Sequence, residues 1–327
     1  MSRVPSPGSR SSSLILARAL RGAKPAPFPG FVAPCLASFR SKVPSARGFV
    51  HELKLDGYRV QAHRRDGRVT LYTRTGLDWT ARFPWIAADM AYLPAGNAIL
   101  DGEIISADAS GNPNFGALQD DLNRRRYDRM VFYAFDLLHL DGFDTRPAPL
   151  IGRKRALQGF LAEARASATR VLYSDHFEDG VALYAQAAKL GLEGVVSKRA
   201  DAPYRSGRGD HWHKTKCWQV GRFIVVGFAP DGMGGLAKLR LARREGDKLV
   251  YAGRVGTGWD YRTARDIRNA LAPLVRPTCP LAKPLRKKDT TWTEPRCEAE
   301  VAYADITDDG MIRHPSFKSL SQRLNDG

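Results

Sequence analysis

Residues 52–59 read Glu52-Leu53-Lys54-Leu55-Asp56-Gly57-Tyr58-Arg59 and follow the apolar pair Phe49-Val50. Side chains alternate between the two faces of an extended segment, so Glu52, Lys54 and Asp56 are expected on one face. Gly57 allows the backbone to bend after them. A lysine attacks an electrophile only as the neutral amine, and with an ordinary pKa near ~10.4 only about one in a thousand is neutral at pH 7.4. We therefore expect burial or nearby cations to lower the pKa of Lys54.

The composition is that of a globular protein with an unusual charge. The 327 residues are 43% hydrophobic and 26% charged, which leaves room for two domains with their own cores. The formal net charge is +17, and the isoelectric point lies near 10.0. This balance predicts a polyanion-binding surface, with nucleic acid ahead of an anionic membrane. No apolar run approaches the ~20 residues of a membrane span.

The cysteines and histidines do not indicate a metal centre. Four cysteines are scattered along the chain without a C-x-x-C pair, at Cys35, Cys217, Cys279 and Cys297. This usage favours a reducing compartment and argues against structural zinc. His211 and His213 stand near Cys217, but their spacing matches no common zinc pattern.

The N-terminal segment has its own composition. Residues 1–51 contain no Asp or Glu, carry eight Arg or Lys, and are rich in Ser and Pro. Such a segment is typical of an organelle transit peptide or of a disordered basic arm that touches phosphate groups. We favour the arm and expect residues 1–27 to be disordered.

Hydrophobic periodicity predicts an α+β protein of two domains, 28–220 and 221–327. In the first, strands are expected at 49–53, 58–63, 68–73, 98–105, 130–138, 171–177, 193–199 and 212–218, and helices at 83–93, 148–164 and 181–190. Arg65-Asp66-Gly67 marks a hairpin turn, and Gly207-Arg208-Gly209 a mobile loop. In the second, strands at 223–228, 236–242, 248–255 and 300–306 with a helix at 263–272 suit a small Greek-key barrel of the oligonucleotide-binding (OB) type.

Several polar residues carry chemistry beyond the lysine stretch. Arg59, and Arg74 in Thr-Arg-Thr-Gly, have the planar fork that pairs bidentately with phosphate. Glu103 lies inside an apolar strand and needs a partner to stay charged. Glu193 suits Mg²⁺, which prefers oxygen ligands. Lys214 and Lys216 are two residues apart and therefore share one face of a strand, where two ammonium groups aimed at one place lower the pKa of a neighbouring lysine.

The chain contains neither a G-x-x-x-x-G-K-[ST] loop nor a G-x-G-x-x-G that opens a helix in a βαβ unit. Phe135 stands in the apolar strand Val131-Phe132-Tyr133-Ala134-Phe135-Asp136, where an aromatic residue is ordinarily part of a core. In their order and spacing, however, the stretches around Lys54, Arg74, Glu103, Phe135, Glu193 and Lys214 resemble the motifs of the covalent nucleotidyltransferases. Among these, the chain most resembles the bacterial ATP-dependent DNA ligases of the end-joining type, from about residue 28 to the C-terminus.

The resemblance implies a nucleotidyltransferase (adenylation) domain followed by an OB domain, with ATP and Mg²⁺ or Mn²⁺ as cofactors. Lys54 would carry AMP, with Asp56, Glu103 and Glu193 at the metal. The implied nucleotide-binding residues are Glu52, Leu53, Arg59, Arg74, Glu103, Phe135, Lys214 and Lys216. Arg59 and Arg74 would hold AMP and the 5′-phosphate of the nick, and Phe135 would stack on the purine. Nicked or broken duplex DNA, the Ku protein and a repair polymerase are the implied partners of a monomeric, cytoplasmic protein at the bacterial nucleoid.

The C-terminal tail departs from the family pattern. The lead-in His314-Pro315-Ser316-Phe317 matches, but Ser321 stands where the arginine of an Arg-x-Asp-Lys motif belongs, and Arg323 and Leu324 replace its acid and base. We expect this change to impair self-adenylation from ATP more than the sealing of a preformed adenylate. Two alternatives stay open. The nearest enzymatic one is an RNA ligase or GTP-using capping enzyme, and the altered tail prompts the other, a DNA-binding protein of ligase fold without turnover.

Overall fold

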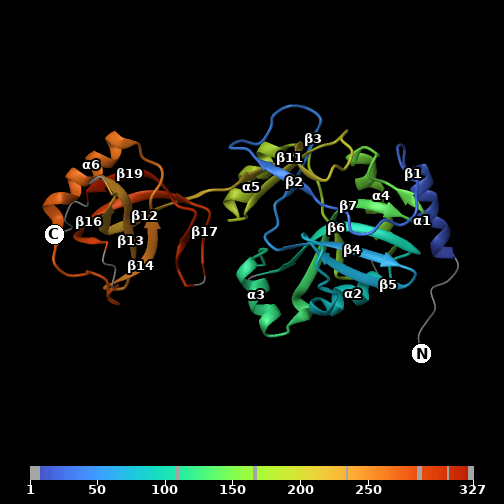
Figure 1. The fold of residues 1–327 in the computed structure, drawn as a ribbon, viewed down its shortest axis with the longest axis horizontal. Helices are drawn as coiled ribbons and strands as arrows, with labels where there is room; N and C mark the ends of the chain where they lie inside the picture. Colours follow the sequence, from blue (N-terminus) through green and yellow to red (C-terminus); the bar gives the residue numbers. More distant parts are fainter. Residues whose placement is uncertain are drawn as a thin grey trace. The chain divides into compact units, whose positions relative to one another are not determined.

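The computed structural model describes residues 8–107, 111–164, 168–232, 235–285, 289–307 and 309–322. The chain divides into two compact units, Met1–Cys217 and Trp218–Gly327, and the predicted boundary near residue 220 lies next to this division. Sheets in both units are largely antiparallel, with helices packed on them (Figure 1). The predicted α+β class is confirmed.

The first unit is built on two sheets. The larger has the strand order β1-β8-β7-β6-β4-β5, with β9 paired to β7. Its strands are β1 (Lys24–Pro25), β4 (Tyr58–Arg65), β5 (Arg68–Thr73), β6 (Asn97–Ser106), β7 (Met130–Leu140), β8 (Phe143–Asp144) and β9 (Val171–Tyr173). The smaller has the order β2-β11-β10-β3, from β2 (Cys35–Phe39), β3 (Phe49–Leu53), β10 (Gly194–Arg199) and β11 (Gly207–Lys216).

Five α-helices accompany these sheets in the described part of the first unit. They are α1 (Gly8–Ala19), α2 (Pro84–Ala91), α3 (Phe115–Asn123), α4 (Leu150–Ala164) and α5 (Gly180–Lys189), with short 3-10 helices at Thr80–Arg82 and Tyr127–Arg129. Side chains cap the N-termini of two of these helices. The Asn114 side chain accepts a hydrogen bond from Ala117 N (2.9 Å) at the start of α3, and the Asp179 side chain accepts one from Ala182 N (2.9 Å) at the start of α5. None of the helices in the described ranges has the length and apolarity of a membrane-spanning segment.

The second unit has a six-stranded sheet of order β14-β13-β12-β16-β15, with β19 paired to β16. It comprises β12 (Gln219–Pro230), β13 (Leu236–Glu245), β14 (Lys248–Val255), β15 (Val275–Arg276), β16 (Thr291–Tyr303) and β19 (Ser316–Gln322), besides the hairpin of β17 (Asp305–Ile306) and β18 (Ile312–Arg313). Helix α6 (Tyr261–Leu271), capped by Asp260, buries Ala264, Ile267 and Leu271 on the core, and Ala272–Leu274 form a 3-10 helix.

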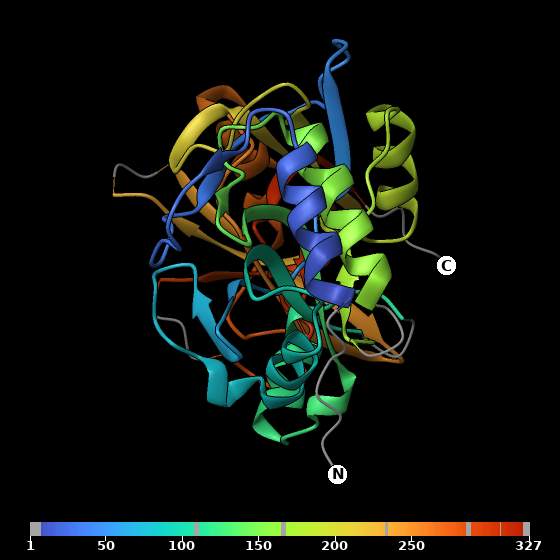
Figure 2. The same ribbon diagram turned by 90° about the vertical axis from the view of Figure 1, so that its right-hand side faces the viewer.

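The disordered arm expected at residues 1–27 is wrong for residues 8–27. Helix α1 lies beside α4 (Figures 1 and 2), and Ala17 is buried in the main core of the unit. The buried Ser13 hydroxyl donates to Asp141 (2.6 Å), and β1 pairs with β8. The prediction relied on the Ser- and Arg-rich composition of this segment. It overlooked buried positions at helical spacing, which include Ser13 and Ala17. Residues 1–7 lie outside the described part.

Two other expectations need correction. Gly207–Gly209 do not form a mobile loop, because β11 begins at Gly207 and pairs in parallel with β2. That strand was not expected, so the sequence showed no partner for the Gly-Arg-Gly stretch. The expected strand at 300–306 is in fact the end of β16 and the short β17, and a further strand that was not expected, β19, follows and pairs with β16.

Candidate active site

The predicted nucleophile lies where three strands meet. Lys54 directly follows β3, and its backbone N–H donates to Gly194 O in β10 (2.8 Å). Its ammonium forms an ion pair with the Glu193 carboxylate. Lys216 of β11 forms a second ion pair with the same carboxylate, and its Nζ lies 3.3 Å from Oε1. Burial lowers the pKa of Lys214, and the ammonium groups of Lys54 and Lys216 lower it further. The smaller sheet thus gathers three lysines around one carboxylate.

A cavity of about 490 Å³ opens beside Lys54. Most of the residues predicted to bind a nucleotide line it, namely Glu52, Leu53, Lys54, Arg59, Arg74, Glu103, Phe135 and Lys214. Lys216 and Glu193 do not line it, although their ion pairs connect them to Lys54. A second hollow of about 320 Å³ shares Arg59, Arg74 and Glu103 with the first. The resemblance therefore selected residues that the fold brings together.

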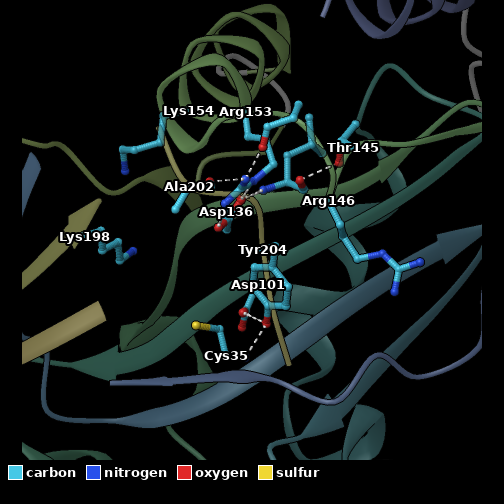
Figure 3. Close-up of polar contacts among 12 residues, drawn as sticks. Cys35, Asp101, Asp136, Thr145, Arg146, Arg153, Lys154, Lys198, Ala202 and Tyr204 are labelled. Carbon is cyan, nitrogen blue, oxygen red and sulfur yellow. Dashed lines mark hydrogen bonds and ion pairs between the residues drawn. The ribbon is translucent and has the colours of Figure 1, made fainter. Parts of the chain in front are cut away.

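Arg59 is held by protein groups in this cavity. Its fork donates twice to Asp101, from Nε (3.0 Å) and Nη2 (2.7 Å), and Nη1 donates to Cys35 O (2.6 Å). Tyr204 donates its hydroxyl to the same Asp101 carboxylate at 2.7 Å, as Figure 3 shows. The guanidinium lies over the ring of Phe135, 5.3 Å from its centroid. Arg59 therefore lines the cavity with its guanidinium held in one orientation and its charge balanced by Asp101.

Glu52 is buried, and ammonium groups occupy both of its carboxylate oxygens. Lys154 of α4 donates to Oε1 (2.6 Å), and Lys198 of β10 donates to Oε2 (2.7 Å). A carboxylate buried in this way is stabilised as the anion only by such partners. The Glu52 side chain is therefore part of a buried ionic cluster at the edge of the cavity.

Glu103 has the most perturbed carboxyl group of the cavity. Burial raises its pKa to about 8, although Lys54 and Arg59 act in the opposite direction. Asp101 and Glu193 add to the increase, which shows that carboxylates accumulate here. A cation beside Glu103 would relieve this repulsion.

The carboxylates only partly fit the predicted metal site. The described ranges contain no group of three His, Cys, Asp or Glu side chains placed to hold an ion, so Asp56, Glu103 and Glu193 do not form one protein cage. Mg²⁺, however, is ordinarily bound by one or two carboxylates plus waters and substrate phosphates. Glu103 and Glu193, which interact electrostatically across the lysine, fit that mode.

The raised pKa of Glu103 predicts a pH-dependent stability. The folded protein holds this proton up to about pH 8, whereas the unfolded chain releases it near ~4.3. The stabilisation is complete below the unfolded pKa and is lost as pH rises through about 8, by at most ~1.4 kcal/mol per pH unit. Metal-free urea unfolding between pH 5 and 9 should show this decline, and Glu103→Gln should flatten it. Parallel curves for the two proteins would contradict the assignment.

Sequence reasoning missed several residues of the cavity. Lys198 and Trp212 line it, and the Lys198 ammonium lies 4.2 Å from the centroids of both Phe135 and Trp212. The sequence offered only one indication of each. Lys198 stands in the same expected strand as Glu193, and Trp212 stands in the same expected strand as Lys214. Asp101 and Tyr204 were also missed as partners of Arg59, because the residues that meet there are distant in sequence.

The altered tail is described only in part. Ser321 belongs to β19, and its hydroxyl donates to Glu298 O at 3.4 Å. Arg323 and Leu324, the other two altered positions, lie outside the described residues. The effect of the tail on self-adenylation therefore stays a prediction.

Known proteins of one kind match most of the chain. A family model described as ATP dependent DNA ligase domain matches residues 33–216, and another described as ATP dependent DNA ligase C terminal region matches 232–323. The "Multifunctional non-homologous end joining protein LigD" of Pseudomonas aeruginosa is 37% identical over 304 residues, which cover 90% of this chain and 36% of the relative. The corresponding protein of Mycobacterium tuberculosis H37Rv is 35% identical over 283 residues, 84% of this chain and 36% of the relative.

The chain thus spans little more than a third of these relatives. Among solved structures, "mycobacterial DNA ligase D complexed with ATP and MES" has 33% identity and a TM-score of 0.51, and the match covers 89% of this chain and 95% of that one. The expected OB fold of the C-terminal region is confirmed, as is the resemblance drawn from the motifs. With both family models matched in order along one polypeptide, the chain belongs to the ATP-dependent DNA ligases.

Proposed function

We propose that this ligase seals nicks or broken ends in duplex DNA through AMP carried on Lys54. The neutral amine attacks the α-phosphorus of ATP, and pyrophosphate leaves. The 5′-phosphate of the nick then displaces Lys54 from the AMP. Finally the 3′-hydroxyl attacks this activated phosphate, a phosphodiester bond forms, and AMP leaves. The observation that supports these three reaction steps is the position of Lys54 in the wall of a cavity that Arg59, Arg74 and Lys214 also line.

The other residues have roles that follow from their charge and position. Lys214 and Lys216 stabilise the charge that develops on the α-phosphate. Glu103 and Glu193 are the residues that would hold Mg²⁺ or Mn²⁺, with Asp56 orienting a water, and the ion would neutralise phosphate charge. Phe135 stacks on the purine. Arg74 is exposed and lines both hollows, which suits a contact with the 5′-phosphate of the nick.

The names of the relatives support a proposal for the pathway. They are named as end-joining proteins, and we infer that this chain serves non-homologous end joining beside Ku and a repair polymerase. It would contact duplex DNA mainly through the sugar-phosphate backbone, which positions a protein without reading sequence.

One experiment tests the activity. Purified protein is incubated with ATP, with Mg²⁺ or Mn²⁺, and with a duplex that contains one nick, and sealing is followed on a denaturing gel. Sealing with ATP but not GTP, on DNA rather than RNA, supports the proposal. Preference for GTP or for an RNA nick would indicate the capping or RNA-ligase alternative, and binding without product would indicate an inert DNA-binding protein.

A second candidate function is prompted by Ser321, which replaces the arginine of the family's tail motif. The chain would then seal a nick that already carries 5′-AMP but load itself poorly from ATP. Comparing sealing of a pre-adenylated nick without ATP with sealing of an ordinary nick with ATP separates the two steps. Equal rates on both substrates would exclude a defect in self-adenylation.

The net charge of +17 predicts a strong salt dependence. Each phosphate that lysine or arginine neutralises releases bound counterions, so the affinity for nicked DNA should fall about tenfold or more between about 50 and about 200 mM salt. Fluorescence anisotropy of a labelled duplex measures this slope. A flat response would contradict binding through the backbone.

A further inference from the structure

The ionic cluster around Glu52 contains more positive than negative charge. Lys154 and Lys198 both donate to the single Glu52 carboxylate, and all three side chains are at most 3% exposed. The neighbouring Asp136 carboxylate raises the pKa of Lys198, but it is itself paired with the buried Arg153 at 2.7 and 2.9 Å. Figure 3 shows that pair together with Lys154 and Lys198. Within the cluster itself, two ammonium groups thus share one carboxylate.

The two lysines differ in where they face. Lys198 lines the cavity beside Lys54, and its ammonium lies over the rings of Phe135 and Trp212. Lys154 is absent from the cavity wall. It comes from α4, donates a second hydrogen bond to Ser174 O (2.9 Å) and lies 4.7 Å from the ring centroid of Tyr173. Lys154 therefore contacts Glu52 without lining the cavity itself, although its other partner, Ser174, does line it.

The electrostatics agree with two cations that share one anion. Burial lowers the pKa of the Lys198 ammonium, Glu52 raises it, and Lys154 lowers it again. Without Lys154, Glu52 and Lys198 would form a closed neutral pair. With Lys154 present, part of the Lys198 charge is available to an anionic ligand in the cavity.

We propose that Lys154 is a positioning residue for nucleotide binding: it neutralises the Glu52 carboxylate through Oε1 and leaves part of the charge of the Lys198 ammonium to the ligand in the cavity. The inference rests on the proposed function, since it takes the ligand to be ATP. The competing explanation is that the ion pair of Lys154 with Glu52 only stabilises the packing of α4 against β3. The two explanations differ in whether the charge of Glu52 matters to ligand affinity.

Binding of α,β-methylene ATP, which cannot donate AMP, tests the proposal by titration calorimetry on the full chain. Lys154→Met should weaken binding about tenfold, as expected for a buried charge withdrawn from an anion at short range. Glu52→Gln/Lys154→Met should bind more tightly than Lys154→Met, because Lys198 regains its free charge. Arg155→Met removes the same charge from an exposed position of α4 and should bind like the wild type.

A matched pair of double variants keeps the test valid if Lys154→Met does not fold. Glu52→Gln/Lys154→Met and Glu52→Gln/Lys198→Met each lose one carboxylate and one ammonium, and neither leaves a buried carboxylate unpaired. The proposal expects the second to bind the analogue about tenfold more weakly than the first. Equal affinities, or a first double variant no tighter than Lys154→Met, would overturn it. Failure of the wild-type protein to bind the analogue would instead count against the proposed function itself.

Discussion

Replacing Lys54 with alanine is expected to abolish the covalent AMP adduct and, with it, ATP-dependent nick sealing. The side-chain amine is the bond-forming atom, and removal of a covalent nucleophile lowers turnover by roughly 10⁴-fold or more. Incubation with [α-³²P]ATP followed by denaturing electrophoresis measures the adduct directly. Lys54→Arg should be equally inactive, because it preserves the positive charge beside Glu193 but supplies no amine nucleophile.

Two controls make this result specific. Lys24→Ala removes an exposed lysine of β1 that does not line the cavity, and it should retain the label. Lys54→Ala should still seal a nick that already carries 5′-AMP, because Lys54 is the nucleophile only in the first step. Label retained by Lys54→Ala would show that another residue carries AMP, and the proposed mechanism would be wrong.

Replacing Arg153 with methionine should lower the free energy of unfolding strongly. Arg153 and Asp136 are both 0% exposed and form a two-point ion pair, so the variant leaves a buried carboxylate without its cation. Breaking such a pair by removing one partner costs about 3–5 kcal/mol. Urea unfolding followed by tryptophan fluorescence measures the difference in the free energy of unfolding.

The double variant Arg153→Met/Asp136→Leu is the control for this prediction. It removes both charges, and replacement of a buried pair by apolar side chains is often close to neutral. Recovery is expected to be incomplete, because Arg153 also donates to Ala148 O (2.5 Å) and Ala202 O (3.1 Å). A single variant as stable as the wild type would show that Asp136 finds another partner.

Sequence reasoning succeeded where a structure depends on neighbouring residues. The turn predicted at Arg65-Asp66-Gly67 forms with positive φ at Asp66 (48°) and Gly67 (81°), which suits the twist of a two-residue hairpin. Strand β3 has the predicted bounds. The order of motifs also selected most of the residues that line the cavity, because the resemblance carries spatial information that periodicity alone does not.

The failures concern contacts between residues far apart in the chain. Strand β2 is short and pairs in parallel with β11, more than a hundred residues later, so no local pattern indicates it. The partners of Glu52 are 102 and 146 residues away. A buried lysine in a basic sequence also looks like a surface charge until its carboxylate is located, which is why Lys154 and Lys198 were not singled out.

The docking of helix α1 and strand β1 on the first unit has a practical consequence for anyone who shortens this chain. Trimming to residue 28, the start of the family resemblance, would strip Ala17 from the core and leave Asp141 without the Ser13 hydroxyl. It would also leave β8 without its β1 neighbour, and an unpaired strand edge promotes aggregation. A soluble fragment for crystallisation should therefore keep residues 8–27.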